Sequence, residues 1–203
     1  MKYTKEWLKE EIKKGKEFSY FGFWGQKSEL INEKAMSNFY KKEFKAPLAH
    51  GKNKGDMVSF TCSEQYFMYL KALIFNDMLV AKKILVNGMD GNYYKSLGRK
   101  VGDLENNPKA KPYDDSTWDS VRDKAMYKAL YFKFKDPQLK QWLLDTGDSI
   151  IVEASPMDKI WGVGLGKTNR QGIYDKSEKW KDVYSWRGDN KLGFLLMEIR
   201  DNL

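Results

Sequence analysis

The sequence predicts a single, mainly α-helical domain with small β elements. Its 203 residues fit one ordinary domain, and 41% hydrophobic with 32% charged residues is typical of a globular protein. Apolar residues recur at helical spacing through the longer segments, whereas the apolar runs that suit strands are short. We therefore expect residues 1–203 to form one domain, with a helix over residues 4–16 as an N-terminal extension.

The N-terminal part is expected to contain one helix and two short strands. Three apolar residues of the 4–16 helix fall on one side of it: Trp7, Leu8 and Ile12. The apolar run 18–25 predicts a short strand. From there to residue 54 the chain is charged and irregular, and residues 56–60 predict a second short strand.

The central part is predicted to begin with one long helix over residues 63–85. Thr61 precedes Glu64 by three residues, which is the spacing of a capping box at a helix start. The apolar face of this helix would be Phe67, Leu70, Leu73 and Ile74. Turn signals follow at residues 87–91, and residues 102–115 predict a polar loop.

The C-terminal part predicts three more helices around one strand. Residues 116–135 and 136–147 form the first two, and the second has a proline at its first helical position. Residues 150–152 are a buried strand. Residues 162–188 are a long loop, and loops of that length in compact domains are usually functional. Residues 192–203 close the chain as a helix.

Cysteine and histidine are too scarce for several kinds of chemistry. Cys62 is the only cysteine, which excludes an internal disulfide, and His50 is the only histidine. A metal site built on these residues and a Ser-His-Asp triad are therefore not expected, nor is a cofactor. We expect Cys62 to be a small packed residue and His50 to lie on the surface.

The lack of long apolar runs and the positive net charge predict a soluble protein that binds polyanions. The first residues lack the apolar core of a signal peptide, and no run approaches about 20 apolar residues, so we expect a cytoplasmic protein without membrane contact. The net charge of +8 fits a phosphate-rich substrate or partner. The alternative is that the lysines, which are spread along the chain, serve only solubility.

One pair of charged residues shares a face of the predicted 63–85 helix. Glu64 and Lys71 are seven residues apart, nearly two turns. A lysine held away from water there loses its proton more readily and becomes a nucleophile. The alternative is that Glu64 caps the helix and that Lys71 extends along the apolar surface to reach solvent.

A second group follows the 150–152 strand. Glu153 and Asp158 flank a proline turn, and Trp161, Gly162 and Gly164 come next. Two carboxylates beside an aromatic plane suit a general acid and an electrostatic stabiliser. The glycines would allow the backbone to approach a phosphate or a ribose. Glu153 has the alternative of acting only as a cap or an ion-pair partner.

Several strings in this order resemble the NADAR (YbiA-like) family over residues 18–203: SNFY, SEQYFMYLKALIF, KSLGR, VEASPMDKIWGVGL and GDNKLGFLLMEIR. The family often has histidine where this chain has Gln65. The resemblance implies a YbiA-like fold and an N-glycosidase that hydrolyses the bond between ribose C1 and a nitrogen.

The resemblance also implies substrates. Some members remove ADP-ribose from the amino group of guanine in nucleic acid, often as antitoxins, and others cleave phosphoribosylamino intermediates of riboflavin synthesis. We expect a guanine de-ADP-ribosylase that acts on ADP-ribosylated DNA, RNA or nucleotide, with a toxin encoded nearby as its partner. The alternatives are the riboflavin-pathway reaction and a non-catalytic module that binds ADP-ribose or nucleic acid.

Two mechanisms are open. In one, Glu153 or Asp158 positions water and stabilises an oxocarbenium ion. In the other, which we favour, neutral Lys71 attacks C1 of the opened sugar to form a Schiff base while Glu64 shuttles protons. The arginines would hold phosphates and Trp24 and Trp161 would stack on a base. The expected substrate-binding residues are Trp24, Ser37, Asn38, Phe39, Arg99, Trp118, Arg122, Ser155, Trp161, Gly162 and Gly164.

Overall fold

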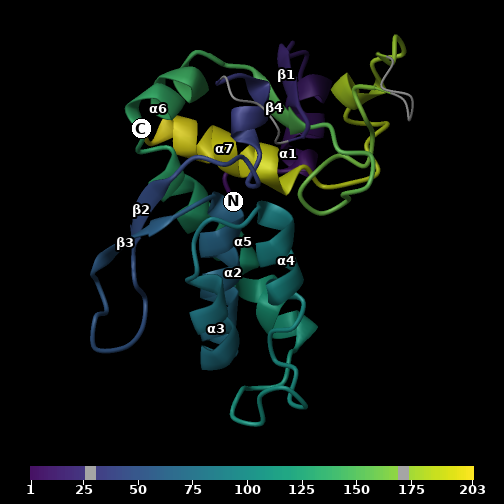
Figure 1. Ribbon diagram of the computed structural model, residues 1–203. Coiled ribbons are helices and arrows are strands. Elements are labelled where there is room, and N and C mark those ends of the chain that lie inside the picture. Colours follow the sequence, from purple (N-terminus) through teal and green to yellow (C-terminus); the bar gives the residue numbers. More distant parts are fainter. Residues whose placement is uncertain (26–30, 169–173) are drawn as a thin grey trace. The chain divides into compact units, whose positions relative to one another are not determined.

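The computed structural model describes residues 1–25, 31–168 and 174–203, and it is mainly α-helical with short strands, as predicted (Figure 1). The chain divides into two compact units. The first consists of Met1–Ser37 together with Pro137–Leu203, and the second is Asn38–Asp136. Each unit has buried residues of its own.

A two-stranded parallel sheet forms the centre of the first unit. Strand β1 (Tyr20–Phe23) pairs with β4 (Ile150–Glu153), and helix α7 (Lys191–Asp201) packs against β4. The first three residues of β4 are fully buried, which explains why this strand is continuously apolar. Gly193 allows the close approach of α7, because a Cβ atom there would collide with the carbonyl oxygen of Ile151.

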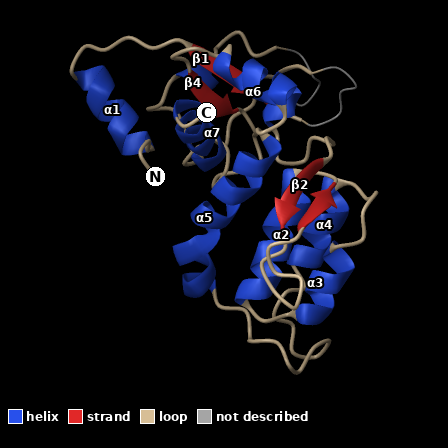
Figure 2. Ribbon diagram, turned by 90° about the vertical axis from the view of Figure 1, so that its left-hand side faces the viewer, coloured by secondary structure: helices blue, strands red, loops and turns tan. Residues whose placement is uncertain are grey.

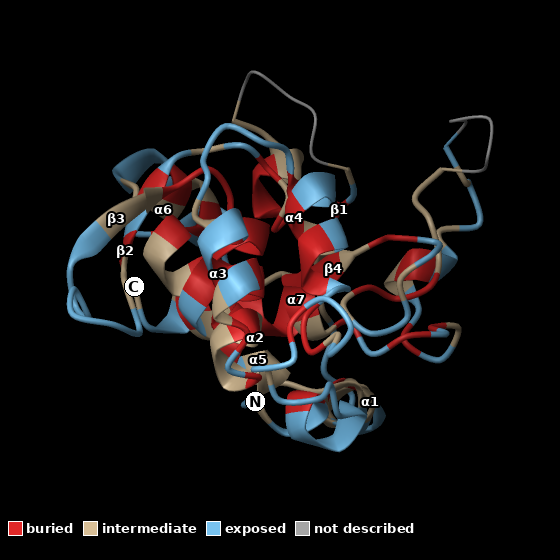
Figure 3. Ribbon diagram, turned by 60° about the horizontal axis from the view of Figure 1, so that its bottom comes forward, coloured by how far each residue is buried: buried red, intermediate tan, exposed pale blue. Residues whose placement is uncertain are grey.

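Short helices complete the first unit: α1 (Lys5–Lys13), the 3₁₀ helix η1 (Glu33–Met36), α6 (Pro137–Leu144) and the 3₁₀ helix η2 (Lys179–Lys181). The hydroxyl of Thr4 accepts a hydrogen bond from the backbone N–H of Trp7 at 3.0 Å and so begins α1 at the predicted place. Only Leu8 of α1 is buried, whereas most residues of α7 are buried (Figure 3). Parts of two predicted irregular segments, residues 26–30 and 169–173, lie outside the described residues.

Helix α2 (Ser63–Ile74) is the centre of the second unit. It packs against α3 (Met78–Ile84), α4 (Gly91–Gly98) and α5 (Asp115–Lys133), and the antiparallel hairpin of β2 (Phe44–Pro47) and β3 (Met57–Phe60) contacts α5 through β2 (Figure 2). Residues 63–70 are all buried, so α2 is covered on every side in its first two turns.

The prediction of one helix over residues 63–85 is wrong. The chain leaves α2 at Asn76, which takes a left-handed conformation with φ of 51°. Asp77 then begins α3, because its carboxylate accepts a hydrogen bond from the N–H of Val80 at 3.1 Å. An apolar pattern that continues through the break conceals it.

The predicted capping box is also wrong. Helix α2 starts after Cys62, which makes no side-chain cap. The hydroxyl of Thr61 instead accepts from the N–H of Gly88 at 3.1 Å, and its own N–H donates to Oε1 of Gln65 at 2.6 Å. Thr61 therefore joins the start of α2 to the segment that follows α3.

Four elements lie where none was expected: the 3₁₀ helices η1 and η2, helix α4 and strand β2. Helix α4 begins at Asp90, whose carboxylate accepts from the N–H of Tyr93 at 2.9 Å, so a residue taken as a turn signal is an N-cap. Strand β2 lies within the stretch predicted to be irregular.

The remaining predicted elements are confirmed within a few residues. They are the strands near 18–25, 56–60 and 150–152 and the helices near 116–135, 136–147 and 192–203. Cys62 is buried, which raises the pKa of its thiol to about 11, and His50 is exposed, both as expected. Within the described ranges, no helix combines the length and the apolar character needed to span a membrane.

We expect Asp77→Ala to destabilise the second unit strongly. The side chain of Asp77 is fully buried and accepts three hydrogen bonds, from Val80 N, Gly102 N and Asn107 Nδ2. Leaving these donors unsatisfied should lower the free energy of unfolding by about 3 kcal/mol or more. Urea denaturation measures the loss. The exposed Glu105→Ala is the control and should be nearly neutral, and equal stability of the two variants would contradict the role of Asp77.

Candidate active site

Lys71 points inward from α2 and is enclosed by aromatic rings. Its ammonium donates to the carbonyl oxygen of Gly98, the last residue of α4, at 2.9 Å. The same nitrogen lies 4.5 Å from the ring centroid of Tyr113 and 5.3 Å from that of Trp118. The side chain is half-buried, and Phe67 packs beside Trp118 at 5.1 Å. Lys71 therefore has the partners of a positioned amine, not those of a side chain that reaches for solvent.

Burial lowers the pKa of Lys71, although the carboxylates of Glu64 and Asp115 act in the opposite direction. Removing an ammonium from water disfavours its charged form, and here this cost exceeds the attraction of the two acids. More of the amine is consequently neutral at a given pH than for a free lysine. A neutral amine is what addition to an imine or a carbonyl requires.

Glu64 is held by Asn38 in the first turn of α2. Its side chain is 3% exposed, and its Oε2 accepts from Nδ2 of Asn38 at 2.5 Å while its backbone N–H donates to the Asn38 carbonyl at 2.9 Å. Helix rise separates the backbones of Glu64 and Lys71 by about 10 Å. The Glu64 carboxylate nevertheless acts on the Lys71 amine by raising its pKa, and Asn38 orients Glu64, so proton transfer through Glu64 stays a prediction.

The other binding residues predicted for this unit lie in separate segments of the chain. Arg122 forms an ion pair with Asp119 at 2.7 Å, one turn away on α5, and its Nε atom is buried without a hydrogen bond in the described structure. Arg99 is exposed directly after the Gly98 carbonyl that binds Lys71. Phe39 is half-buried, with the ammonium of Lys95 5.4 Å from its ring.

In the first unit, Glu153 lies at the carboxyl end of β4. It pairs in register with Phe23 of β1, and Trp24, which is 45% exposed, follows β1 at the same edge because the strands are parallel. The N–H of Glu153 donates to Oδ1 of Asn190 at 2.9 Å, and its carbonyl accepts from Ser155 and Val163. The backbone of Glu153 is thus held on both sides, and its side chain is half-buried.

Asp158 shapes the turn that follows. Its Oδ1 accepts from the N–H groups of Ile160 at 2.9 Å and Trp161 at 2.8 Å. A Cβ atom at Gly162 would lie 2.8 Å from the carbonyl oxygen of Glu153, so the absence of a side chain here allows two backbone segments of the protein to pack closely. Asp158 therefore has a structural task in the turn.

The remaining predicted binding residues of this unit differ in exposure. Ser37 and Ser155 are buried, at 4% and 7% exposure. Trp161 is half-buried, and its carbonyl accepts from the N–H of Leu192 at the start of α7. Gly164 has a φ of 69°, a left-handed conformation that favours glycine.

Sequence reasoning missed several residues that organise these two groups. Tyr113 lies in a segment assigned to a polar loop, and no pattern marked it as a wall beside Lys71. Asn190 is fully buried, and its Nδ2 donates to the carbonyl of Ile151 at 2.8 Å in addition to the bond that its Oδ1 makes with Glu153. The signal in the sequence was a Gly188-Asp189-Asn190 turn directly before the predicted C-terminal helix.

Two further features bear on which residues act. Lys133 is fully buried, which lowers its pKa to about 7, yet a substrate cannot reach a side chain without exposed surface. Lys71 is therefore the better candidate nucleophile.

Gln65 donates to Ile84 O and Asn87 Oδ1 and accepts from Thr61, so its amide joins α2 to the end of α3. Over the described ranges, no three His, Cys, Asp or Glu side chains gather as a metal site requires.

Comparison with known proteins identifies the family. The model of the NADAR domain matches residues 22–203, a range that begins after α1. Protein irg-1 of Caenorhabditis elegans is 37% identical over 176 residues, which cover 83% of this chain and 74% of that protein. N-glycosidase R617 of Acanthamoeba polyphaga mimivirus is 33% identical over 183 residues, which cover 90% of this chain and 95% of that protein.

A solved structure agrees with this result. The NMR structure of the Escherichia coli protein YbiA is similar with a TM-score of 0.60 and 25% identity, over 92% of this chain and 86% of that one. The predicted YbiA-like fold is therefore confirmed. The chain belongs to the NADAR domain family and is a glycosidase of N-glycosyl bonds.

Proposed function

We propose that this glycosidase removes ADP-ribose from the exocyclic amino group of guanine in nucleic acid, with Lys71 as its nucleophile. The observation that carries the proposal is the half-buried amine with a lowered pKa, held by the Gly98 carbonyl between Tyr113 and Trp118. The flat faces of these two rings also suit a purine or its ribose.

The chemistry follows from the type of bond. A ribose whose C1 carries an exocyclic nitrogen opens to an imine. Neutral Lys71 adds to C1, a proton passes to the guanine nitrogen, and the amine departs as the lysine–ribose imine forms. Water then adds to this imine, which releases the free sugar aldehyde and restores the lysine amine. No atom outside substrate, lysine and water is needed.

Glu153 is the second residue that we propose for catalysis, because a carboxylate favours a developing positive charge at C1. Its backbone is fixed through Asn190, so its side chain starts from a defined position. Arg99 and Trp24, both exposed, are proposed as contacts for phosphate and base, respectively.

Salt dependence should reveal a nucleic-acid substrate. With a net charge of +8, phosphates that bind Lys or Arg release counterions, so kcat/KM for an ADP-ribosylated oligonucleotide should fall roughly 20- to 40-fold between 50 and 200 mM salt if about three phosphates are contacted. The matching ADP-ribosylated mononucleotide should lose much less. Both substrates are assayed at both salt concentrations.

Other outcomes would change the proposal. Parallel salt dependence with equal kcat/KM would show that the charge does not select nucleic acid. Turnover of a phosphoribosylamino-pyrimidine, without turnover of either guanine substrate, would replace the proposal by the small-molecule reaction. A toxin partner is tested separately, by co-expression of this chain with a guanine-modifying toxin.

A further inference from the structure

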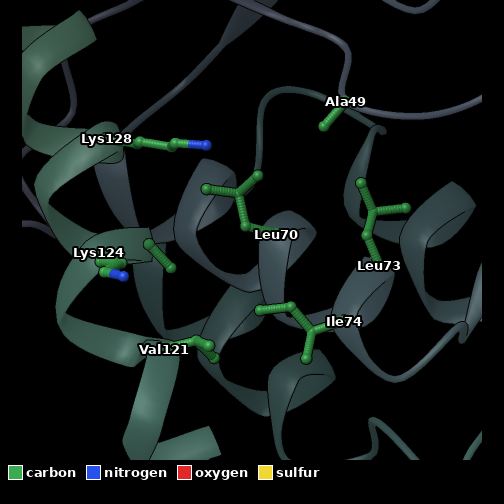
Figure 4. Close-up of a pocket in the computed structure, with 8 residues that line it drawn as sticks. Ala49, Leu70, Leu73, Ile74, Val121, Lys124 and Lys128 are labelled. Carbon is green, nitrogen blue, oxygen red and sulfur yellow. The ribbon is translucent and has the colours of Figure 1, made fainter.

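A cavity of about 360 Å³ lies in the second unit between α2 and α5 (Figure 4). Its apolar surface comes from Leu70, Leu73 and Ile74 of α2, from Val121 of α5 and from Ala49 of the β2–β3 connection. Leu73, Ile74 and Val121 are only half-buried. The fold therefore leaves aliphatic surface open to solvent in a concave site.

Two lysines give this cavity a charge. Lys124 and Lys128 are four residues apart on α5 and both line it, and in Figure 4 the side chain of Lys128 extends from α5 towards Leu70. No carboxylate lines the cavity, and neither lysine has an ion-pair partner among the residues that the structure describes. Like charges one turn apart repel each other, so a bound anion would relieve them.

The cavity is separate from the Lys71 group. Leu70 precedes Lys71, and neighbouring residues of a helix point about 100° apart. The Lys71 amine meets α4 at Gly98 and the ring of Tyr113, whereas the cavity faces a different stretch of α5 and the β2–β3 connection. None of the residues around the Lys71 amine lines it.

We propose that this cavity binds a small anionic amphiphile, a short hydrocarbon or ring that ends in one carboxylate. The apolar body lies on Leu70, Leu73 and Ile74, and the carboxylate lies between Lys124 and Lys128. The volume is at the lower end of the range for small-molecule sites, about 300–1,000 Å³, which suits one short chain. Apolar walls with a few charged groups at one side are the usual composition of such sites.

The proposal is tested by titrating the full chain with octanoate and measuring binding by NMR and calorimetry. Octanol is the neutral probe of equal length and octylammonium the cationic one. We expect octanoate to bind about tenfold more tightly than octanol, because charge-assisted hydrogen bonds contribute most to the difference, and octylammonium to bind more weakly than both. Lys124→Gln with Lys128→Gln should remove the advantage of octanoate and leave octanol unchanged.

Matched variants keep the test decisive. Lys82 and Lys83 are exposed on α3, and the double variant Lys82→Gln with Lys83→Gln should leave the affinities for octanoate and octanol unchanged. Val121→Trp should fill the cavity and abolish binding of both octanoate and octanol, with circular dichroism to show that the fold remains. Equal affinities for octanoate and octanol, or a double α5 variant that binds octanoate normally, would overturn the proposal. So would binding of an acidic, leucine-rich peptide without any binding of octanoate, which would indicate a protein partner.

Discussion

Lys71→Arg should lower kcat by about 10³-fold or more while the protein stays folded. Arginine is slightly longer than lysine and keeps a positive charge, but its guanidinium stays protonated and cannot add to an imine. Lys71→Met tests the same loss with the charge removed. If the amine served only to fill space or to attract phosphate, arginine would keep most of the activity.

A covalent intermediate separates these explanations further. Cyanoborohydride added during turnover should reduce the lysine–ribose imine to a stable adduct on Lys71, which mass spectrometry locates. The exposed Lys82→Arg is the matched control and should be trapped like the parent chain. Near-normal turnover of Lys71→Arg, or an adduct on another residue, would move the nucleophile elsewhere.

The pH dependence should follow the same amine. Because burial lowers the pKa of Lys71, the neutral form becomes populated at lower pH than in a free lysine, and kcat should rise through that pKa as pH increases. The midpoint should therefore lie below 10.5, the ordinary value for lysine. Lys71→Arg should lose this limb of the profile together with its activity.

Helical periodicity explains why part of the fold was predictable. The buried residues of α5 recur at helical spacing and those of β4 form one continuous apolar run, and each pattern lies within a single segment of the sequence. The break between α2 and α3 was not predictable from the sequence, because the residues that stabilise it are remote along the chain. Asp77 binds Gly102 and Asn107, 25 and 30 residues further along, and no periodic pattern records such bonds.

The candidate site shows the same division. That Glu64 and Lys71 share a face of a helix follows from their spacing, whereas the carbonyl of Gly98 reaches Lys71 from 27 residues away. Asn190 binds the backbone N–H of Glu153 across 37 residues. It does so from a left-handed conformation with φ of 54°, of which the sequence gives no sign other than the preceding Gly188 and Asp189. Motif strings located the catalytic candidates, and only the folded chain assigned partners to them.

Glu153→Gln should reduce kcat about 10²- to 10⁴-fold, the usual contribution of a positioned acid or base, whereas Asp158→Asn should stay within a few-fold of the parent chain. The two carboxylates differ in what they bind. Asn190 anchors the backbone of Glu153, so a glutamine at this position keeps the shape of the side chain and removes only its negative charge.

Asp158 instead uses Oδ1 to accept from the N–H groups of Ile160 and Trp161, a task that the amide oxygen of asparagine can continue. Asp158→Ala removes both bonds and should lower the stability of the turn, which circular dichroism and thermal denaturation would register. If Asp158→Asn proved as inactive as Glu153→Gln with its stability intact, the charge of Asp158 would belong to the chemistry. If Glu153→Gln kept full turnover, the carboxylate route would have no residue left at the end of β4, and the lysine route would account for the reaction without it.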